Sequence, residues 1–139
     1  MTVWHRAAAL AAALALFPPP APADPGGRAY KTFEQPLPNV PGKTMTAVVV
    51  EYPPGGTTPP HRHAASGFVF AYVLEGAVRS QIGGAPVRVY RAGESWYENP
   101  GDHHAVSENA SDTEPARLLA VFVADDGDTL TTLDSAPSD

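Results

Sequence analysis

Short runs of β-branched, aromatic and other apolar residues alternate with turn signals along most of the chain. Val48, Val49 and Val50 lie in one such run, and Gly83-Gly84 separates two others in a way that is typical of a hairpin. No stretch after the first 23 residues has a sustained period of 3.6. The pattern predicts strands at residues 30–34, 44–52, 68–75, 77–82, 87–91, 94–98, 104–108 and 117–124. Seven or eight strands at this spacing predict an all-β protein, an antiparallel sandwich or closed barrel.

Composition narrows the class of protein further. A length of 139 residues allows one domain, and 16 prolines disfavour a helical bundle. Nine Lys and Arg against 15 Asp and Glu give a net charge of -6, which repels phosphate backbones, so we expect no nucleic-acid partner. The absence of Cys excludes disulfides, thiolate metal ligands and a Cys nucleophile.

The first 23 residues have the pattern of a secretory signal peptide. Arg6 precedes an apolar run at residues 7–17, which is too short to span a bilayer. Small residues at Ala21 and Ala23 occupy the two positions that a signal peptidase reads, so cleavage is predicted before Asp24. The alternative is an uncleaved apolar arm. The pattern predicts export to the periplasm or the medium, with no membrane attachment after cleavage.

The remaining chain divides into three segments by composition. Residues 24–43 form an N-terminal extension that contains Pro and Gly, and residues 44–124 contain most of the predicted strands. Residues 125–139 are acidic, and we expect them to be a solvated tail without a role.

Four of the five histidines lie in two short segments. His61 and His63 are two residues apart, so in a strand both imidazoles point to the same face and can bind one metal ion. His103 and His104 are adjacent, so only one of them can face the same interior. A lone His-x-His is more often a surface pair, but that reading leaves the second His segment unexplained.

The spacing of these residues resembles the two motifs of the cupin superfamily, in particular small single-domain cupins of the conserved-barrel type. Gly55, His61, His63 and Gly76 match the first motif, which has a Gly, five residues and His-x-His before a Glu and a second Gly. The second motif is matched by Gly93, Gly101 and His104. The resemblance implies an antiparallel jelly-roll β-barrel over residues 44–124, with metal ligands His61, His63 and His104. It places His103 outside the metal site.

The chain departs from the cupin pattern at three positions. Val69 stands where the first motif has its metal-binding Glu, and Asn99 and Glu108 replace the Pro and Asn of the second motif. The site therefore resembles the three-His variant of some cupin dioxygenases that act on thiols or diketones. Losing a carboxylate makes a metal centre more positive and should favour an anionic second ligand. The alternative is a degenerate barrel without metal.

The cofactor implied is one divalent transition metal: Fe, Mn, Ni, Cu or Zn. Nitrogen ligands suit all five, and affinity alone does not choose among them. Three protein ligands leave coordination positions open for water, oxygen or a substrate.

Alternation along residues 68–75 predicts the wall of the substrate pocket. Val69, Ala71 and Val73 share one face, and if that face is the interior the pocket is apolar. The opposite face carries residues 68, 70, 72 and 74, which would pack on the second sheet or on a partner subunit, so a homodimer is compatible with the pattern. Trp96 is a further candidate for the pocket wall.

Glu98 is the candidate catalytic carboxylate. It lies six residues before His104 and shares a strand face with Trp96. Facing inward, it could be a fourth metal ligand or a general base in an apolar pocket. Facing outward, it would be a solvated carboxylate at the rim, and the sequence leaves both readings open.

The function that follows is an exported single-domain cupin that binds a small molecule at one metal. If it is an enzyme, a dioxygenase-like oxidoreductase acting on an enolisable or phenolic substrate is the first hypothesis. The alternatives are a non-catalytic module that binds a metal or a small ligand, and a sugar or sugar-acid isomerase. An isomerase would need a more polar pocket than Val69, Ala71 and Val73 provide. The fold alone does not decide between them.

Overall fold

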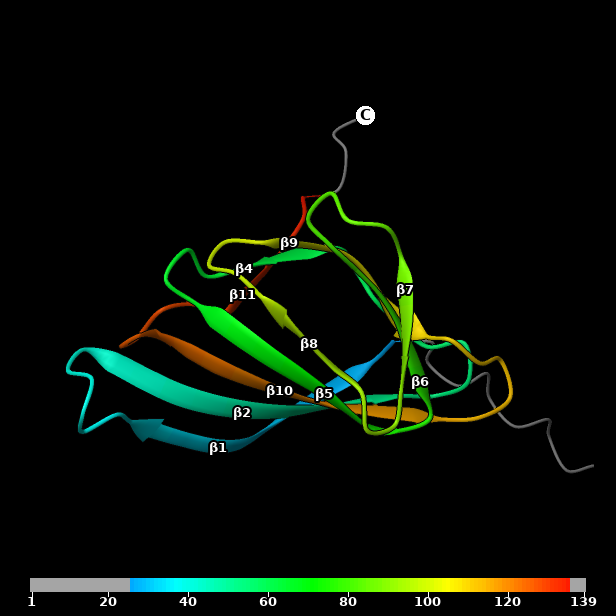
Figure 1. The fold of residues 1–139 in the computed structure, drawn as a ribbon, viewed down its shortest axis with the longest axis horizontal. Helices are drawn as coiled ribbons and strands as arrows, with labels where there is room; N and C mark the ends of the chain where they lie inside the picture. The colour runs from blue at the N-terminus through cyan, green and yellow to red at the C-terminus, as the bar shows by residue number, and fades with distance from the viewer. Residues whose placement is uncertain (1–25, 136–139) are drawn as a thin grey trace, which may run out of the picture.

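Two antiparallel sheets enclose the interior of the molecule (Figure 1). The computed structural model describes residues 26–135, so the predicted signal peptide lies outside the described residues. Between residues 26 and 135 there is no helix, and so none that could cross a membrane. The predicted all-β, antiparallel fold is confirmed.

One sheet has five strands, in the order β1-β2-β10-β5-β8. The three longest are neighbours: β1 (Arg28–Pro36), β2 (Lys43–Tyr52) and β10 (Ala116–Asp125). The other two are β5 (Phe68–Glu75) and β8 (Ser95–Glu98). The β1–β2 pair contains an irregularity between Lys31 and Phe33, where the register shifts.

The second sheet has six strands, five of them in the order β11-β4-β9-β6-β7. They are β11 (Thr131–Leu133), β4 (His61–His63), β9 (His103–Asn109), β6 (Ala77–Ile82) and β7 (Arg88–Arg91). The sixth, β3 (Thr57–Thr58), also pairs with β9. Strands far apart in sequence therefore lie side by side in both sheets, as in a jelly roll.

The interior is built from alternate residues of the longer strands. Along β10 the even-numbered residues from Ala116 to Ala124 are buried while the odd-numbered ones are not, which is the period of a half-buried strand. At one end of the interior, Val73 and Val78 pack with Tyr52, Leu118 and their neighbours. A smaller apolar cluster joins Val69, Ala120 and Phe122.

Gly76 makes the turn between β5 and β6 possible. Its φ of 69° lies in the left-handed region, and a Cβ there would clash with the Pro115 carbonyl oxygen. The motif glycine is therefore required by backbone conformation and by close packing.

The structure confirms one expectation about the ends of the chain and corrects another. The strand predicted at residues 30–34 of the N-terminal extension is part of β1, which pairs along β2. The predicted solvated tail contains β11, which pairs with the His-x-His strand β4, so the expectation of a tail without a role is wrong. The expected seven or eight strands become eleven within the described residues, because β3, β4 and β11 have only two or three residues each and too short a pattern to detect.

Candidate metal centre

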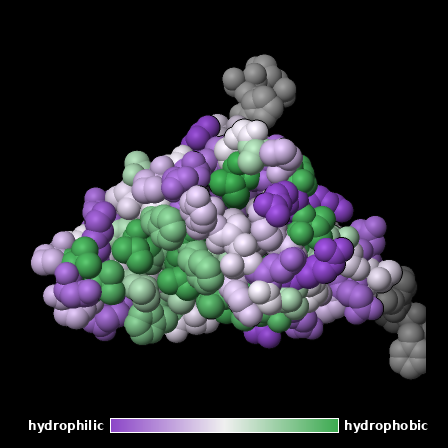
Figure 2. All heavy atoms as spheres, in the orientation of Figure 1, coloured by the Kyte–Doolittle hydropathy of each residue, from purple (hydrophilic) through white to green (hydrophobic). Residues whose placement is uncertain are grey.

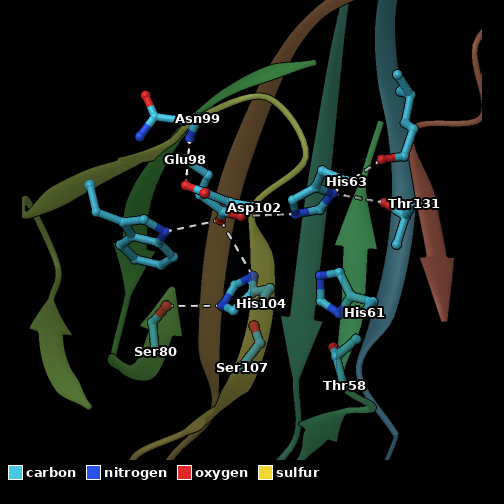
Figure 3. A network of polar contacts seen from close by, with 12 residues as sticks. Thr58, His61, His63, Ser80, Glu98, Asn99, Asp102, His104, Ser107 and Thr131 are labelled. Carbon is cyan, nitrogen blue, oxygen red and sulfur yellow. Dashed lines mark hydrogen bonds and ion pairs between the residues drawn. The ribbon is translucent and has the colours of Figure 1, made fainter. Parts of the chain in front are cut away.

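The His-x-His segment forms the short strand β4, and its alternation sets the site. His61 and His63 are buried and Arg62 is exposed, so the two imidazoles share the inner face. His104 comes from the neighbouring strand β9, directly opposite His61. One nitrogen from each of the three rings lies within 4.8 Å of the others (Figure 3). The three predicted ligands therefore converge on one place.

Hydrogen bonds to the outer ring nitrogens fix the orientation of two imidazoles. The Nδ1 atom of His61 lies 2.8 Å from the Pro59 carbonyl oxygen, and Nδ1 of His63 lies 3.1 Å from the Leu130 carbonyl oxygen. Because a carbonyl only accepts, each Nδ1–H donates, and Nε2 keeps a lone pair that can bind a metal. His104 is held from its other nitrogen, with Nε2 2.9 Å from Ser80 Oγ.

Glu98 faces inward and lies beside two of these rings. Its side chain is 2% exposed. Oε2 lies 3.1 Å from His63 Nε2, and Oε1 lies 3.3 Å from His104 Nδ1. The Trp96 indole N–H donates to Oε1 at 3.1 Å, whereas Oε2 is buried without a hydrogen-bond partner. Of the two orientations that the sequence left open for Glu98, the inward one is therefore adopted and the solvated rim position is not.

Burial sets the protonation of the cluster. It lowers the pKa of His104 from 6.5 to about 4, and it also lowers the pKa of His61. For Glu98, burial alone would raise the pKa, but the contacts with His63 and His104 outweigh it and the pKa lies below the ordinary value. At neutral pH His61 and His104 therefore present neutral imidazoles, the form that binds metals, beside an ionised carboxylate.

Comparison with known families agrees with the motifs and the fold. Residues 48–122 match the model of the Cupin domain family, Cupin_2, which is more than half of the chain. The chain belongs to the cupin family. Among curated proteins, none is similar enough to match it.

Several solved structures resemble this cupin. An oxalate oxidase is 29% identical with a TM-score of 0.52, over 58% of this chain and 42% of that one. An uncharacterized conserved protein with a double-stranded β-helix domain from Klebsiella pneumoniae is 20% identical with a TM-score of 0.64, over 84% of this chain and 90% of that one. The DMSP lyase DddQ from Ruegeria pomeroyi is 23% identical with a TM-score of 0.56, over 68% and 45%. The last two show the fold alone, and the chain spans about two fifths of the oxalate oxidase.

The carboxylate that this cupin lacks at position 69 is present across the β5–β8 strand pair. Val69 lies directly opposite Glu98 in the register, and both side chains are buried on the inner face. The motif comparison predicted a three-His site because Val69 replaces the motif Glu, and it left open whether Glu98 faces inward. The structure adopts the inward orientation, so a carboxylate lies beside the three histidines.

A cavity of about 260 Å³ adjoins the three histidines and Glu98. Val69, Ala71 and Trp96 line it, together with Val48, Val50, Leu118, Ala120 and Phe122 among others. Val73, the fourth predicted wall residue, does not line the cavity. It has the predicted orientation, but Val78, Ala116 and Leu118 pack around it and leave no space there.

Several residues of the site were not predicted. Leu130 and Thr131 line the cavity and contact His63, and Ala29 of β1 closes another part of the wall. Tyr52 reaches across the interior, where its hydroxyl lies 2.7 Å from Ser107 Oγ and 2.9 Å from Thr58 Oγ1. No motif identifies these residues, because their positions depend on pairing between distant segments.

His103 lies away from the cluster. Its Nε2 is 2.7 Å from Asp134 Oδ2, outside the cavity, in a contact between β9 and the residue that follows β11. This is the position expected for the neighbour of an inward-facing His104 on a strand.

Proposed function

We propose that this cupin binds one divalent transition metal through His61, His63 and His104 and acts on a small molecule as a dioxygenase-like oxidoreductase. The observation that carries the proposal is the convergence of three buried imidazoles at an apolar cavity. Three imidazole nitrogens with one carboxylate nearby suit Fe, Mn, Ni, Cu or Zn. The buried Oε2 of Glu98 accepts no hydrogen bond, so a bound cation would not have to break one to approach it.

The bound metal would polarise a substrate oxygen as a Lewis acid, and iron would in addition activate dioxygen. The chain supplies the rest. The carbonyls of Pro59 and Leu130 hold two imidazoles in the tautomer that binds, and Ser80 orients the third. The apolar wall formed by Val69, Ala71 and Phe122 excludes water from the reacting position.

The cavity wall favours a substrate that is mostly apolar. Among the described residues that line the cavity there is no Lys or Arg. A dianion such as oxalate would therefore find no cationic side chain to bind it, although the chain is similar to an oxalate oxidase over part of its length. An enolisable diketone or a phenol presents one oxygen to the metal and buries an apolar body, and 260 Å³ is slightly below the range of pockets for drug-sized ligands.

Metal content tests the first part of the proposal. The purified protein, loaded with Fe(II), Mn(II) or Zn(II) and freed of excess metal, should contain one ion per chain by elemental analysis. Replacing His61, His63 or His104 with Ala should remove most of it, because two imidazoles bind much more weakly than three. His103→Ala is the matched control and should keep the metal. Equal loss in His103→Ala and His104→Ala would contradict the assignment, as would a parent that takes up no metal.

Oxygen uptake tests the reaction class. The Fe(II)-loaded protein should consume oxygen when 2,4-pentanedione or a catechol is added, and not with oxalate. Conversion of a sugar acid without oxygen uptake would favour the isomerase, and binding of a diketone without turnover would favour the non-catalytic module.

We also propose that the chain is exported and acts in the periplasm or the medium. The support is the pattern of residues 1–23, with a basic residue, a short apolar run and small residues before Asp24. A fusion to a reporter that is active only after export should give activity, and the mature protein should begin at Asp24. Full-length protein retained in the cytosol would contradict the proposal.

A further inference from the structure

The carboxylate of Glu98 lies where an adjacent ligand of the same metal would lie. Two donor atoms that bind one first-row metal at about 2.1 Å and at right angles are about 3 Å apart. The distances from Glu98 are 3.1 Å to His63 Nε2 and 3.3 Å to His104 Nδ1. Because Nδ1 of His63 donates to the Leu130 carbonyl, its Nε2 carries a lone pair, and the short contact with Oε2 brings two lone pairs toward a common point.

The buried carboxylate also lacks a charge partner. Apart from histidines, no cationic side chain among the described residues forms an ion pair with Glu98. An ionised group in an apolar interior is costly unless a cation compensates it. Trp96 donates one hydrogen bond to Oε1, which orients the carboxylate and leaves Oε2 directed at the cluster.

We propose that Glu98 is the fourth protein ligand of the metal, delivered from β8 to the place that a residue at position 69 of β5 would otherwise fill. The inference rests on the proposed function, since it needs a metal held by the three histidines. The cross-strand register explains how a carboxylate on β8 can replace one on β5, because Val69 and Glu98 are direct partners and both face inward. Their side chains therefore reach the same part of the site from adjacent strands.

Metal affinity, measured with Mn(II) and Co(II) by competition with a fluorescent chelator, tests this assignment. Glu98→Gln keeps the shape of the side chain but removes its charge, and it should weaken binding by roughly tenfold or more. The Co(II) absorption spectrum should also change, because a ligand is altered. Glu75→Gln, an exposed carboxylate on β5, is the control and should bind like the parent.

Exchanging the two partners sharpens the test. Glu98→Val should bind metal weakly, and the double variant Val69→Glu/Glu98→Val should recover most of the affinity. Parent affinity and an unchanged Co(II) spectrum in Glu98→Gln would overturn the assignment while leaving the three-histidine site intact. A parent that binds no metal would overturn the proposed function itself, so the two failures are distinguishable.

A second inference rests on the outer face of the five-stranded sheet. Apolar side chains from all five strands lie in the middle of this face, and one row in register runs Phe33, Ala47, Val121, Phe70 and Tyr97. Exposure is high for large side chains: Tyr30, Phe33, Phe68, Phe70, Leu74 and Tyr97 are 40% to 61% exposed. Figure 2 shows apolar side chains gathered on the left of the molecule, over the region that β5, β10 and β2 occupy in Figure 1.

Charged groups lie at the two ends of this face and leave its middle free. The Arg117–Glu51 ion pair borders one end and the Lys43–Asp125 pair borders the other. An apolar centre with a polar rim is the arrangement of a protein interface. From strand spacing and length, the face measures roughly 600 Å² per copy, or about 1,200 Å² for two copies, which reaches the lower limit of stable interfaces.

We infer that a second copy of this chain packs on this face. Two such faces can stack as aligned sheets about 10 Å apart without burying an unpaired charge, since the middle rows carry none. A charged partner protein would gain nothing from these rows, whereas an identical apolar face is complementary to them.

Sedimentation velocity tests the inference over a range of concentrations. The parent should sediment at twice the mass of one chain, and Phe70→Arg should sediment as a monomer because it places a charge in the centre of both faces. Val89→Arg, at a similarly exposed residue of β7 on the other sheet, is the control and should remain dimeric. A parent that is still monomeric at a chain concentration of about 100 µM would overturn the inference, because a dimer with a lower Kd would be largely formed there. A dimeric Phe70→Arg would also overturn it.

Discussion

The two sheets that enclose the cavity contribute different chemistry. The six-stranded sheet supplies His61, His63 and His104, with Ser80 and Ser107 beside them. The five-stranded sheet supplies an apolar wall and one carboxylate, Glu98. Substitutions in the first sheet should therefore change metal binding more than folding, and most substitutions in the second should change folding more than metal binding.

The largest expected effect on folding lies in the apolar wall. Leu118 is buried on β10 between the core cluster and the cavity. Leu118→Ala should lower the free energy of unfolding by about 3 kcal/mol, because it removes buried methyl groups and enlarges a space that cannot fully collapse. Urea denaturation measures the loss. The metal content should stay at the parent value, and a strong loss of metal in the folded variant would contradict the division between the sheets.

The pH dependence of the metal-free protein should depend on the six-stranded sheet. The pKa of His104 is about 4 in the folded chain and near 6.5 in the unfolded chain. Between pH 6.5 and pH 4 this histidine is protonated in the unfolded chain but not in the folded chain. The free energy of unfolding is therefore highest above pH 6.5 and falls by up to about 3 kcal/mol as the pH drops towards 4. The lowered pKa of His61 acts in the same direction.

Urea titrations at pH 7, 6, 5 and 4.5 in the presence of a chelator would measure this slope. His104→Asn should reduce the slope to the part that His61 contributes, because the group with the larger lowering of pKa is gone. A slope that does not depend on residue 104 would place the effect elsewhere in the molecule.

Metal removal should have a slightly smaller effect. A ligand at 100 times its Kd stabilises the folded state by about 2.7 kcal/mol. A chelator should therefore lower the Tm of the metal-loaded parent by several degrees, and it should hardly change that of His61→Ala. Calorimetry of both proteins with and without chelator checks this. An equal shift in the variant would mean that the metal binds outside the three-histidine cluster.

Sequence patterns predicted those parts of the site that depend on local spacing. His-x-His on a strand, and His104 rather than His103, follow from alternation and motif register, and the structure brings the three together. Glu98 was a candidate from its spacing to Trp96 and His104, but its inward orientation could not be predicted. That orientation depends on the pairing of Val69 with Glu98, two residues 29 positions apart that only the fold makes neighbours. The same holds for Leu130, whose carbonyl holds His63 from a segment that composition alone marks as a tail.

The smallest predicted effect lies where the two sheets are joined by hydrogen bonds. The hydroxyl of Tyr52, on β2, reaches Ser107 of β9 and Thr58 of β3. Tyr52→Phe keeps the buried ring but leaves the two smaller hydroxyls without this partner, so it should cost about 1 kcal/mol of stability. Because Ser107 and the three histidines share the cavity wall, a small loosening there should also speed hydrogen exchange in β9 more than in β10. Equal changes in hydrogen exchange in both strands would show that the two sheets loosen together. The two sheets would then differ in the side chains that they supply to the cavity but not in local stability.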